Sequence, residues 1–307
     1  YIEGDGRAPF RYDGTRSDDP NDTVPHEHHR ELRGLFVFAA WLGHNDIKCL
    51  NTYDSLVEEN GVRYIRHYLI DFGASLGSDS FTVKSPRAGY DYLFRWRPML
   101  AQMFSLGIYV PKWVRASYPH YRSVGNFESE IFEPEEWKSN YPAPIFDNRL
   151  PDDTFWAARQ VMWFTDEEIR ALVETGHYSN PEAVNWLVQC LIERCNKIGW
   201  TYFAKVLPLD RFRISAGRLE FEDLGVTYGF VPSRELSIRW SRFDNEAGTH
   251  HPIAGATGPA LPPDIGAAGG GSYFAATITF DNPAKSVTVY LRQTGPVPAI
   301  VGIDRGW

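Results

Sequence analysis

The chain has 307 residues, of which 43% are hydrophobic and 15% aromatic, and this is enough to build one large domain or two ordinary ones. The formal net charge of −8 argues against a general nucleic-acid-binding protein, because such proteins normally present a basic surface. No apolar run approaches the roughly 20 residues that cross a bilayer, so we expect no membrane span.

The start of the chain is polar and rich in turn-forming residues. Residues 1–27 include Asp5-Gly6 and the run Asp18-Asp19-Pro20, so we expect an extended arm or surface loop there. The first residue is Tyr rather than Met. Together with the aromatic, glycine-rich composition, this favours a periplasmic or extracellular location, and a cytoplasmic location stays open.

A helix and a hairpin are expected next. Apolar side chains recur at helical spacing over residues 28–43, and Gly43 is well placed to end that helix. Two strand-like segments, residues 52–57 and 62–70, follow a loop and flank Glu58-Glu59-Asn60-Gly61. An Asn-Gly pair between two strands is a strong signal for a tight β-hairpin.

The region up to residue 207 is expected to be mainly helical, although residues 74–150 are irregular and rich in Pro, Tyr and Trp. One helix is expected around Tyr90–Leu106, despite Pro98. Helices with clearer signals are expected over Thr154–Phe164, from the capping box of Thr165 and Glu168 to about Gly176, and from the capping box of Ser179 and Glu182 to about Phe203.

The pattern changes after Pro208, where short alternating segments predict strands. The strands expected are Phe212–Ile214, Leu219–Phe221, Leu236–Trp240, Tyr273–Phe280 and Ser286–Arg292. A Pro/Gly-rich loop is expected over Pro259–Gly271. Residues 208–307 are therefore expected to form a β-rich, sandwich-like domain.

Two short motifs carry residue types that phosphoryl transfer needs. The first is His44-Asn45-Asp46-Ile47-Lys48-Cys49-Leu50-Asn51, and the second is Asp71-Phe72-Gly73 at the end of the second strand. Phosphoryl transfer needs an Asp beside the attacking hydroxyl and metal ions on the phosphates. Hard carboxylate and amide oxygens are the natural ligands of magnesium.

These motifs match H-R-D-x-K-x-x-N and D-F-G in type, order and spacing, with Asn45 in place of the family's Arg. On them, residues 28–77 resemble the core of the protein-kinase-like superfamily, closer to atypical bacterial members than to signalling kinases. The resemblance could extend through the helices to residue 206. It implies an α+β fold with an arm over residues 1–27, a helical, kinase-C-lobe-like domain with a small hairpin core over 28–207, and the β-rich domain over 208–307.

The resemblance also implies a role for each matching residue. The implied roles are catalytic base for Asp46, contact with the transferred phosphate for Lys48, magnesium binding for Asn51 and Asp71, and structural support for His44, Phe72 and Gly73. An active enzyme would then transfer a phosphoryl group from ATP, with magnesium, to a hydroxyl on an unknown acceptor.

One part of a kinase is not evident in the sequence. Only 43 residues precede His44, without a Gly-rich phosphate loop or any Lys before Lys48. An N-lobe would then be supplied by another chain or segment, or it was cut away, or it never existed. The alternative is a non-catalytic, pseudokinase-type structural or interaction protein of a secreted or surface assembly, with self-assembly as one form of partnership.

Other groups of reactive side chains favour structural interpretations. His26-Glu27-His28-His29, with His67, could hold a metal, but the spacing fits no zinc motif, and a solvated helix N-terminus is the preferred interpretation. His250-His251 is expected in a loop. Several aromatic residues could line a sugar-binding surface, although core packing is preferred; they are Tyr118, Tyr121, Trp96, Trp113 and Trp137.

The cysteines and the acidic pairs are also expected to be structural. Cys49, Cys190 and Cys195 are expected to be free and mostly buried thiols. Asp152-Asp153 and Asp166-Glu167-Glu168 lie where helix N-termini favour negative charge.

Overall fold

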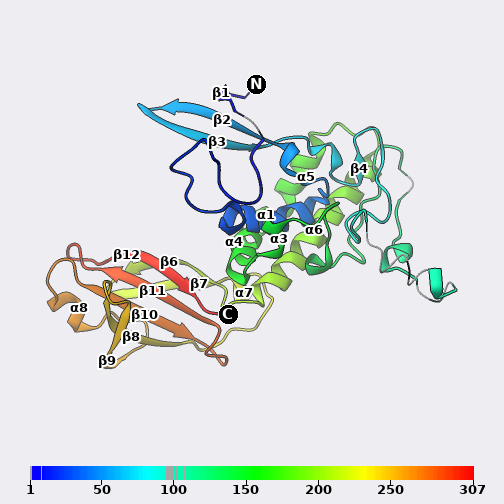
Figure 1. Cartoon of the computed structure of the whole chain (residues 1–307). Helices are drawn as coiled ribbons and strands as arrows, with labels where there is room; N and C mark the ends of the chain where they lie inside the picture. Colours follow the sequence, from blue (N-terminus) through cyan, green and yellow to red (C-terminus); the bar gives the residue numbers. More distant parts are fainter. Residues whose placement is uncertain are drawn as a thin grey trace. The chain divides into compact units, whose positions relative to one another are not determined.

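The computed structural model describes residues 2–7, 9–94, 100, 103–106, 108, 110–119 and 121–307. The chain is an α+β protein, as predicted, and it forms two compact units, Tyr1–Gly199 and Trp200–Trp307. Figure 1 shows most of the helices and a long hairpin in the first unit and the large antiparallel sheet in the second. Within the described part of the chain, none of the helices combines the length and apolarity that crossing a bilayer requires.

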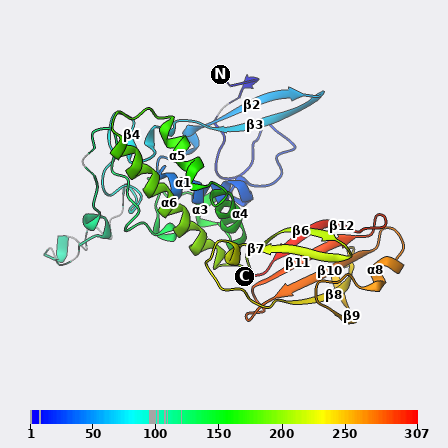
Figure 2. The same ribbon diagram turned by 180° about the vertical axis from the view of Figure 1, so that it is seen from behind.

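The first unit is built around α1, Arg30–Leu42, which Figures 1 and 2 show beside α3, α4 and α6. Trp41 in its last turn is buried and donates from Nε1 to the carbonyl of Leu191 in α6 at 2.9 Å. The helix ends at Gly43, whose φ of 62° is the left-handed conformation of a helix C-cap. The predicted stop at Gly43 is confirmed.

The remaining helices of the first unit are short, except for the last. They are α3 Pro144–Asp147, α4 Pro151–Val161, α5 Asp166–Glu174 and α6 Pro181–Phe203, whose last residues belong to the second unit. Short 3₁₀ turns cover His26–His28, Cys49–Asn51, Phe72–Ala74, Lys112–Arg115 and Pro134–Glu136. A small ribbon pairs β4 Ser78–Asp79 with β5 Thr82–Val83.

The N-terminal caps of α5 and α6 were both predicted from capping-box patterns. Thr165 and Glu168 form the predicted capping box, with Glu168 N donating to Thr165 Oγ1 and Thr165 N donating to Glu168 Oε2. The cap of α6 was misassigned by one residue. Asn180, rather than Ser179, accepts from the amide of Glu182, because Pro181 fits the first helical position directly after it.

The predicted hairpin is confirmed, with β2 two residues longer and β3 one residue shorter than expected. Strand β2 runs over Thr52–Glu59 and β3 over Val62–Leu69, joined by Asn60 and Gly61 at φ of 53° and 77°. Positive φ at both loop residues is the type I′ geometry that suits the twist of two paired strands. The base of the hairpin is closed by the Thr52–Leu69 pair and by Ile70 N, which donates to the Asn51 carbonyl at 2.9 Å.

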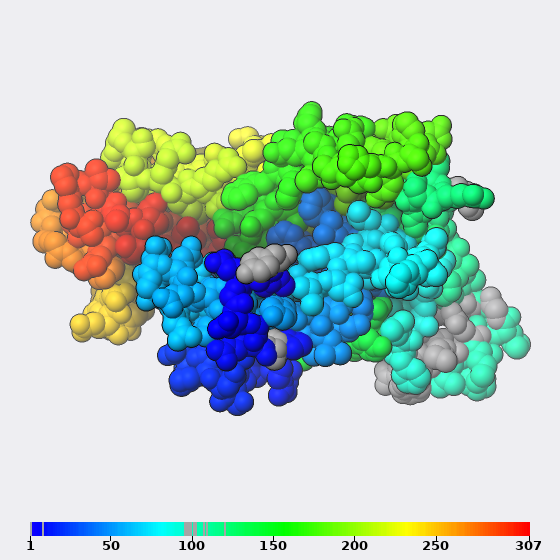
Figure 3. Space-filling view, turned by 90° about the horizontal axis from the view of Figure 1, so that it is seen from above, coloured from blue at the N-terminus to red at the C-terminus, as the bar shows by residue number. Residues whose placement is uncertain are grey.

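The N-terminal arm packs against this hairpin. A two-residue strand, β1 Asp5–Gly6, pairs with β2, and Phe10 N donates to Thr52 Oγ1 at 2.9 Å. Figure 3 shows the dark-blue arm lying against the light-blue hairpin. Polar side chains of the arm therefore gain buried partners, which a sequence pattern of turns does not reveal.

The irregular middle of the first unit contains a tight backbone crossing. The carbonyl of Gly77 accepts from the amides of Lys84 and Asn126 at 2.9 and 3.1 Å. A Cβ on Gly125 would lie 1.8 Å from that oxygen, so only glycine fits there. Most of the helix predicted around Tyr90–Leu106 lies outside the described residues, as does Trp96. Trp137 is buried, as core packing predicts.

The second unit is a five-stranded antiparallel sheet and a two-stranded hairpin. The strand order is β12-β11-β10-β8-β9, and β6 pairs with β7. The strands are β6 Leu209–Ser215, β7 Arg218–Asp223, β8 Ser237–Asp244, β9 Thr249–Thr257, β10 Tyr273–Thr279, β11 Ser286–Arg292 and β12 Ala299–Arg305, with short helices α7 Leu224–Thr227 and α8 Pro263–Ala267. Buried side chains of both sheets, including Trp240, Phe274 and Leu219, form the core.

Three local predictions for this unit were wrong. Strands β9 and β12 were not predicted, because β9 is largely exposed and β12 contains glycine and little alternation. His250 lies in β9 rather than in a loop, and its ring packs 4.9 Å from that of Phe243. The expected loop over Pro259–Gly271 contains α8, whose Ile265 reaches the core.

Candidate functional site

The two motifs lie on either side of the base of the hairpin, one before β2 and one after β3. The segment from His44 leaves the end of α1 and leads through a 3₁₀ turn, ending at Asn51, into β2. Asp71 follows directly after β3. Closure of the hairpin at its base thus brings residues 44–51 and the Asp71 turn to one end of a single β-ribbon.

Asp46 lies at the centre of a polar network. Lys48 Nζ donates to both of its carboxylate oxygens, at 2.9 and 3.1 Å, and Asn51 Nδ2 donates to Oδ2 at 3.1 Å. Asn140, distant in sequence, donates to Oδ1 at 3.3 Å and accepts from Asn45 at 2.7 Å. Partial burial acts to raise the pKa of Asp46, but these hydrogen bonds outweigh it and hold the pKa below its ordinary value. Asp46 is therefore ionised at neutral pH, as an acceptor of a hydroxyl proton must be.

Lys48 connects the two motifs electrostatically. Its hydrogen bond with Asp46 raises its pKa, and the charges of Asp46 and of Asp71 add to this effect. Both carboxylates therefore lie within electrostatic reach of one ammonium group. The Lys48 side chain remains 39% exposed, which leaves it accessible to an anionic ligand.

The Asp71 turn has an unusual backbone. Asp71 itself adopts φ 60° and ψ 68°, a left-handed conformation that is uncommon for residues other than glycine. Gly73, for which the resemblance implies structural support, meets a close neighbour. A Cβ on Gly73 would lie 2.7 Å from Ser80 Oγ, and the Gly73 carbonyl accepts from Ser80 N at 3.1 Å. Gly73 thus permits the close approach of Ser80.

His44 supports the turn from the loop side. It is buried, and burial lowers its pKa, so the ring is neutral at pH 7. Its Nδ1 lies 3.2 Å from the carbonyl of Ala74, which assigns the proton to Nδ1. The ring also lies 5.4 Å from that of Phe72, which is 53% exposed. The predicted structural role of His44 has a clear basis here, whereas Phe72 is only partly packed.

The side-chain oxygens of Asn51 and Asp71 are the atoms that would bind magnesium. The two side-chain hydrogen bonds of Asn51 use Nδ2, toward the Asp46 carbonyl and carboxylate, and leave the acceptor capacity of Oδ1 for another group. Asp71 is exposed and supplies a carboxylate. Carboxylate and amide oxygens suit magnesium, which also keeps several waters. No group of three or more His, Cys, Asp or Glu side chains suited to a metal occurs among the residues that the structure describes.

An open pocket of about 540 Å³ lies beside the Asp71 turn. Phe72 and Gly73 form part of its wall, and Phe81 and Arg122 line it further out. Phe81 is fully exposed. The pocket therefore combines apolar surface and a cation beside the turn.

Lys84 is a site residue that the sequence analysis missed. It is only 5% exposed, and its Nζ donates to the carbonyls of Gly43 at 2.8 Å and Ala74 at 2.7 Å. Burial lowers its pKa to about 8, so the ammonium form still predominates at pH 7. One signal could have suggested such a residue. The last turn of α1 contains no basic side chain, although its carbonyls need donors.

Arg194 of α6 supports the same end of α1 from inside. Its guanidinium is buried between the rings of Phe127 and Phe132, 4.1 and 4.3 Å from their centroids. It donates to the Glu128 carbonyl at 2.6 Å and to the Ala40 carbonyl at 3.0 Å. Burial raises the pKa of Glu128, whose carboxylate lies 3.8 Å from Arg194.

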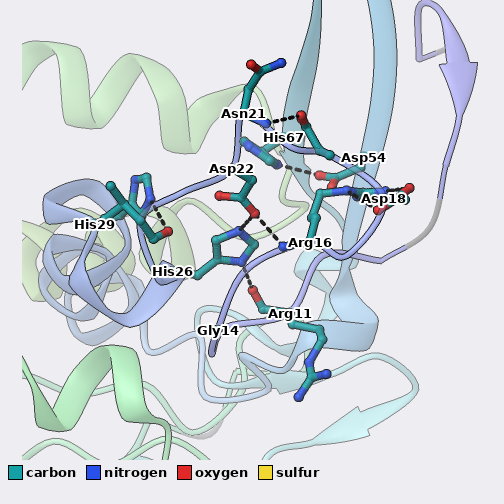
Figure 4. Close-up of polar contacts among 12 residues, drawn as sticks. Arg11, Gly14, Arg16, Asp18, Asn21, Asp22, His26, His29, Asp54 and His67 are labelled. Carbon is teal, nitrogen blue, oxygen red and sulfur yellow. Dashed lines mark hydrogen bonds and ion pairs between the residues drawn. The ribbon is translucent and has the colours of Figure 1, made fainter.

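A second polar network joins the arm to the hairpin (Figure 4). Asp54 of β2 is fully buried and pairs with Arg16 and with His67 Nδ1. His26 is 5% exposed and bonds to Asp22 at 2.9 Å through Nε2 and to the Arg11 carbonyl through Nδ1. The expectation of a solvated helix N-terminus is therefore wrong for His26. Its ring is 6.4 Å from that of His67, and each ring is bound to a different Asp.

The surroundings of the cysteines and of the Asp152-Asp153 pair are those of residues that support the fold. Cys190 and Cys195 are buried and free, with burial raising their pKa values to about 11 and 12, whereas Cys49 is exposed. Asp153 accepts from Leu150 N at 2.8 Å at the start of α4 and also pairs with Arg33 of α1. Helix capping thus explains only part of its role.

No protein-family model matches this chain, and neither the curated proteins nor the solved structures contain a match to it.

Proposed function

We propose that this protein is an atypical kinase-like phosphotransferase that uses ATP and magnesium to phosphorylate a hydroxyl group. The observation that carries the proposal is the arrangement around Lys48. Its ammonium donates hydrogen bonds to both carboxylate oxygens of Asp46, and Asn51 donates to the same carboxylate. The negative charge of Asp71 contributes to the raised pKa of Lys48. Phosphoryl transfer needs such a combination of a base, a cation and hard oxygen ligands.

Each residue has a role in the proposed reaction. Asp46 orients the acceptor hydroxyl and accepts its proton, since its carboxylate is ionised at neutral pH. Lys48 turns from Asp46 to the transferred phosphate. Asn51 Oδ1 and Asp71 would hold magnesium, which neutralises phosphate charge when bound. The pocket beside Phe72 gives the acceptor a place to bind.

The proposal includes a partner. Protein kinases cover the nucleotide phosphates with a Gly-rich loop and a strand-borne Lys, which the motifs of this chain do not include. We propose that another chain or segment supplies this part of the nucleotide site. Nucleotide affinity for the present chain is accordingly expected to be weak.

Thermal-shift titration with Mg-ATP tests the proposal. The wild-type chain should be stabilised, the Asp71→Ala variant should not, and ATP with EDTA should have no effect on either. Asp304→Ala, which removes an exposed carboxylate from β12 in the second unit, serves as the matched control. Equal shifts for wild type and Asp71→Ala would contradict the proposed metal site, and no shift at any ATP concentration would contradict nucleotide binding.

The second candidate function is a non-catalytic interaction protein. The observation in its favour is a set of large apolar side chains exposed in the middle of the first unit, at 73–100%. They are Phe81, Phe94, Phe104, Leu106 and Ile108. Large apolar side chains exposed to this degree are typical of surfaces that contact another molecule when they lie together. Sedimentation analysis that finds concentration-dependent assembly, together with no Mg-ATP shift, would favour this candidate.

A further inference from the structure

We infer that Lys84 is a positioning residue that holds the segment carrying Asp46 and the turn carrying Asp71 in fixed relation to each other. The inference rests on the proposed function for the meaning of that relation, but the contacts of Lys84 stand independently of it. Lys84 lies outside both motifs, directly after β5.

Lys84 binds the backbone of two separate segments. Gly43 is the C-cap of α1 and immediately precedes His44, while Ala74 ends the 3₁₀ turn that contains Phe72 and Gly73. One ammonium group donates to both carbonyls, at 2.8 and 2.7 Å. Hydrogen bonds with a charged partner are stronger than those between neutral groups. The two segments are therefore joined by a single side chain.

Lys84 and the residues after the Asp71 turn supply donors to the C-terminal end of α1, in addition to those of Arg194. The last four carbonyls of a helix need partners, and a cation there is favoured by the helix dipole. No basic residue lies in the last turn of α1. Instead, Leu76 N donates to the Leu42 carbonyl at 2.9 Å, and Lys84 donates to that of Gly43. The Asp71 turn and the residues after it thus cap the helix that leads to Asp46.

The backbone of Lys84 is itself hydrogen-bonded through both its amide and its carbonyl. Its amide donates to the Gly77 carbonyl at 2.9 Å, and its carbonyl accepts from Asn126 Nδ2 at 2.8 Å. The Gly77 and Gly125 backbones are in such close contact that a Cβ on Gly125 would lie 1.8 Å from the Gly77 carbonyl oxygen. The Ala74 carbonyl also accepts from His44, so two neighbouring side chains converge on one oxygen.

The charges around Lys84 come from several elements. Asp79 of β4 and Asp46 favour its ammonium form, and Arg194 of α6 opposes it. Glu128 and Tyr118 line the same small cavity of about 20 Å³, which has room for one water molecule. Burial outweighs the favourable charges and lowers the pKa of Lys84 to about 8.

Hydrogen exchange of the turn amides tests the inference without nucleotide. Lys84→Met keeps the length of the side chain and removes its donors, and Lys112→Met makes the same change at an exposed ion pair with Glu136. In Lys84→Met, the amides of Leu76 and Ser80 should lose about tenfold or more in protection, because two charge-assisted hydrogen bonds are lost. The amide of Ile169 in α5 should be unchanged.

A pH profile gives a readout that simple loss of packing would not give. When the turn opens, Lys84 returns to water and to an ordinary pKa, so the open form binds more protons above about pH 8. Protection of the Ser80 amide should therefore rise roughly tenfold in the wild type between pH 7 and pH 9, after correction for the intrinsic exchange rate. Lys84→Met should show no such rise.

The nucleotide experiment separates the outcomes. If the wild type is stabilised by Mg-ATP, Lys84→Met should lose most of this shift. Unchanged exchange in Lys84→Met would overturn the inference whatever nucleotide does. Changed exchange with a full Mg-ATP shift would also overturn it, because Lys84 would then be structural only. If Mg-ATP does not stabilise the wild type, the proposed function fails. The hydrogen-exchange rates of the Leu76 and Ser80 amides, and their pH dependence, then decide by themselves whether Lys84 joins the two segments.

Discussion

Replacing Arg194 with Met should destabilise the first unit strongly and in a pH-dependent way. The substitution removes the cation that lies 3.8 Å from the carboxylate of Glu128, a residue that is only 2% exposed. It also removes the side-chain donor to the Ala40 carbonyl, which retains Gly43 N as a donor at 3.2 Å. Breaking a buried ion pair by removing one partner typically costs about 3–5 kcal/mol. Met retains contact with Phe127 and Phe132 but not the guanidinium stacking, so we expect a loss near the upper end of this range.

The pH dependence follows from Glu128. Burial raises its pKa in the folded protein, so the folded state binds this proton more readily than the unfolded state, and Glu128 reduces stability as the pH rises through that pKa. Loss of Arg194 should raise the pKa further. The difference in unfolding free energy between wild type and Arg194→Met should therefore be larger at pH 7 than at pH 4.

Urea denaturation followed by far-UV circular dichroism measures this difference, because helices α1 and α6 dominate the signal of the first unit. The control is Arg194→Met combined with Glu128→Gln, which removes the unpaired charge and retains groups for Tyr90 and Ile131. The double variant should recover about 1–3 kcal/mol. A loss below about 1 kcal/mol for Arg194→Met, or no recovery in the double variant, would refute this account of the pair.

Two further predictions concern the backbone crossing and the polar network. Gly125→Ala should lower the free energy of unfolding by about 3 kcal/mol or more, because a Cβ would lie 1.8 Å from the Gly77 carbonyl oxygen. The control Gly266→Ala in α8 should be near neutral, because its Cβ meets no atom within 4 Å. Melting temperatures that fall equally in the two variants would contradict this prediction. Asp46→Asn should lower the free energy of unfolding at pH 7. The loss should become progressively smaller as the pH falls below about 4, because the pKa of Asp46 is lowered in the folded protein and its charge stops stabilising the fold once the carboxylate is protonated. A constant difference in denaturation midpoint across that range would show that the Asp46 charge does not contribute.

Local chemistry explains which parts of the fold could be predicted. Gly43, Asn60-Gly61 and Thr165 each solve a problem of the backbone within a few residues, by a left-handed cap, a type I′ turn and a capping box. Such features can be recognised in a sequence. The α6 cap was misplaced because Ser179 and Asn180 are adjacent and chemically similar, and only the position of Pro181 decides between them.

The candidate site could be predicted only in part. The residues of the two motifs were found because they are close in sequence, and the resemblance assigns their roles. Asn140 and Lys84 reach the same place from distant segments, through side-chain contacts with Asp46, Gly43 and Ala74. No periodicity or spacing encodes such contacts. The burial of His26 has the same origin, since Asp22 and the Arg11 carbonyl become its partners only when the arm folds back.

The β2–β3 hairpin makes the geometry of the site independent of the ribbon's length. Asn51 and Asp71 flank its base, and their separation is set by the Thr52–Leu69 pair rather than by the number of residues between them. The exposed tip at Asn60-Gly61 can therefore be lengthened or carry a fluorescent label without altering that separation. The hairpin is thus a natural attachment point for a probe that reports on partner binding while the two motifs remain untouched.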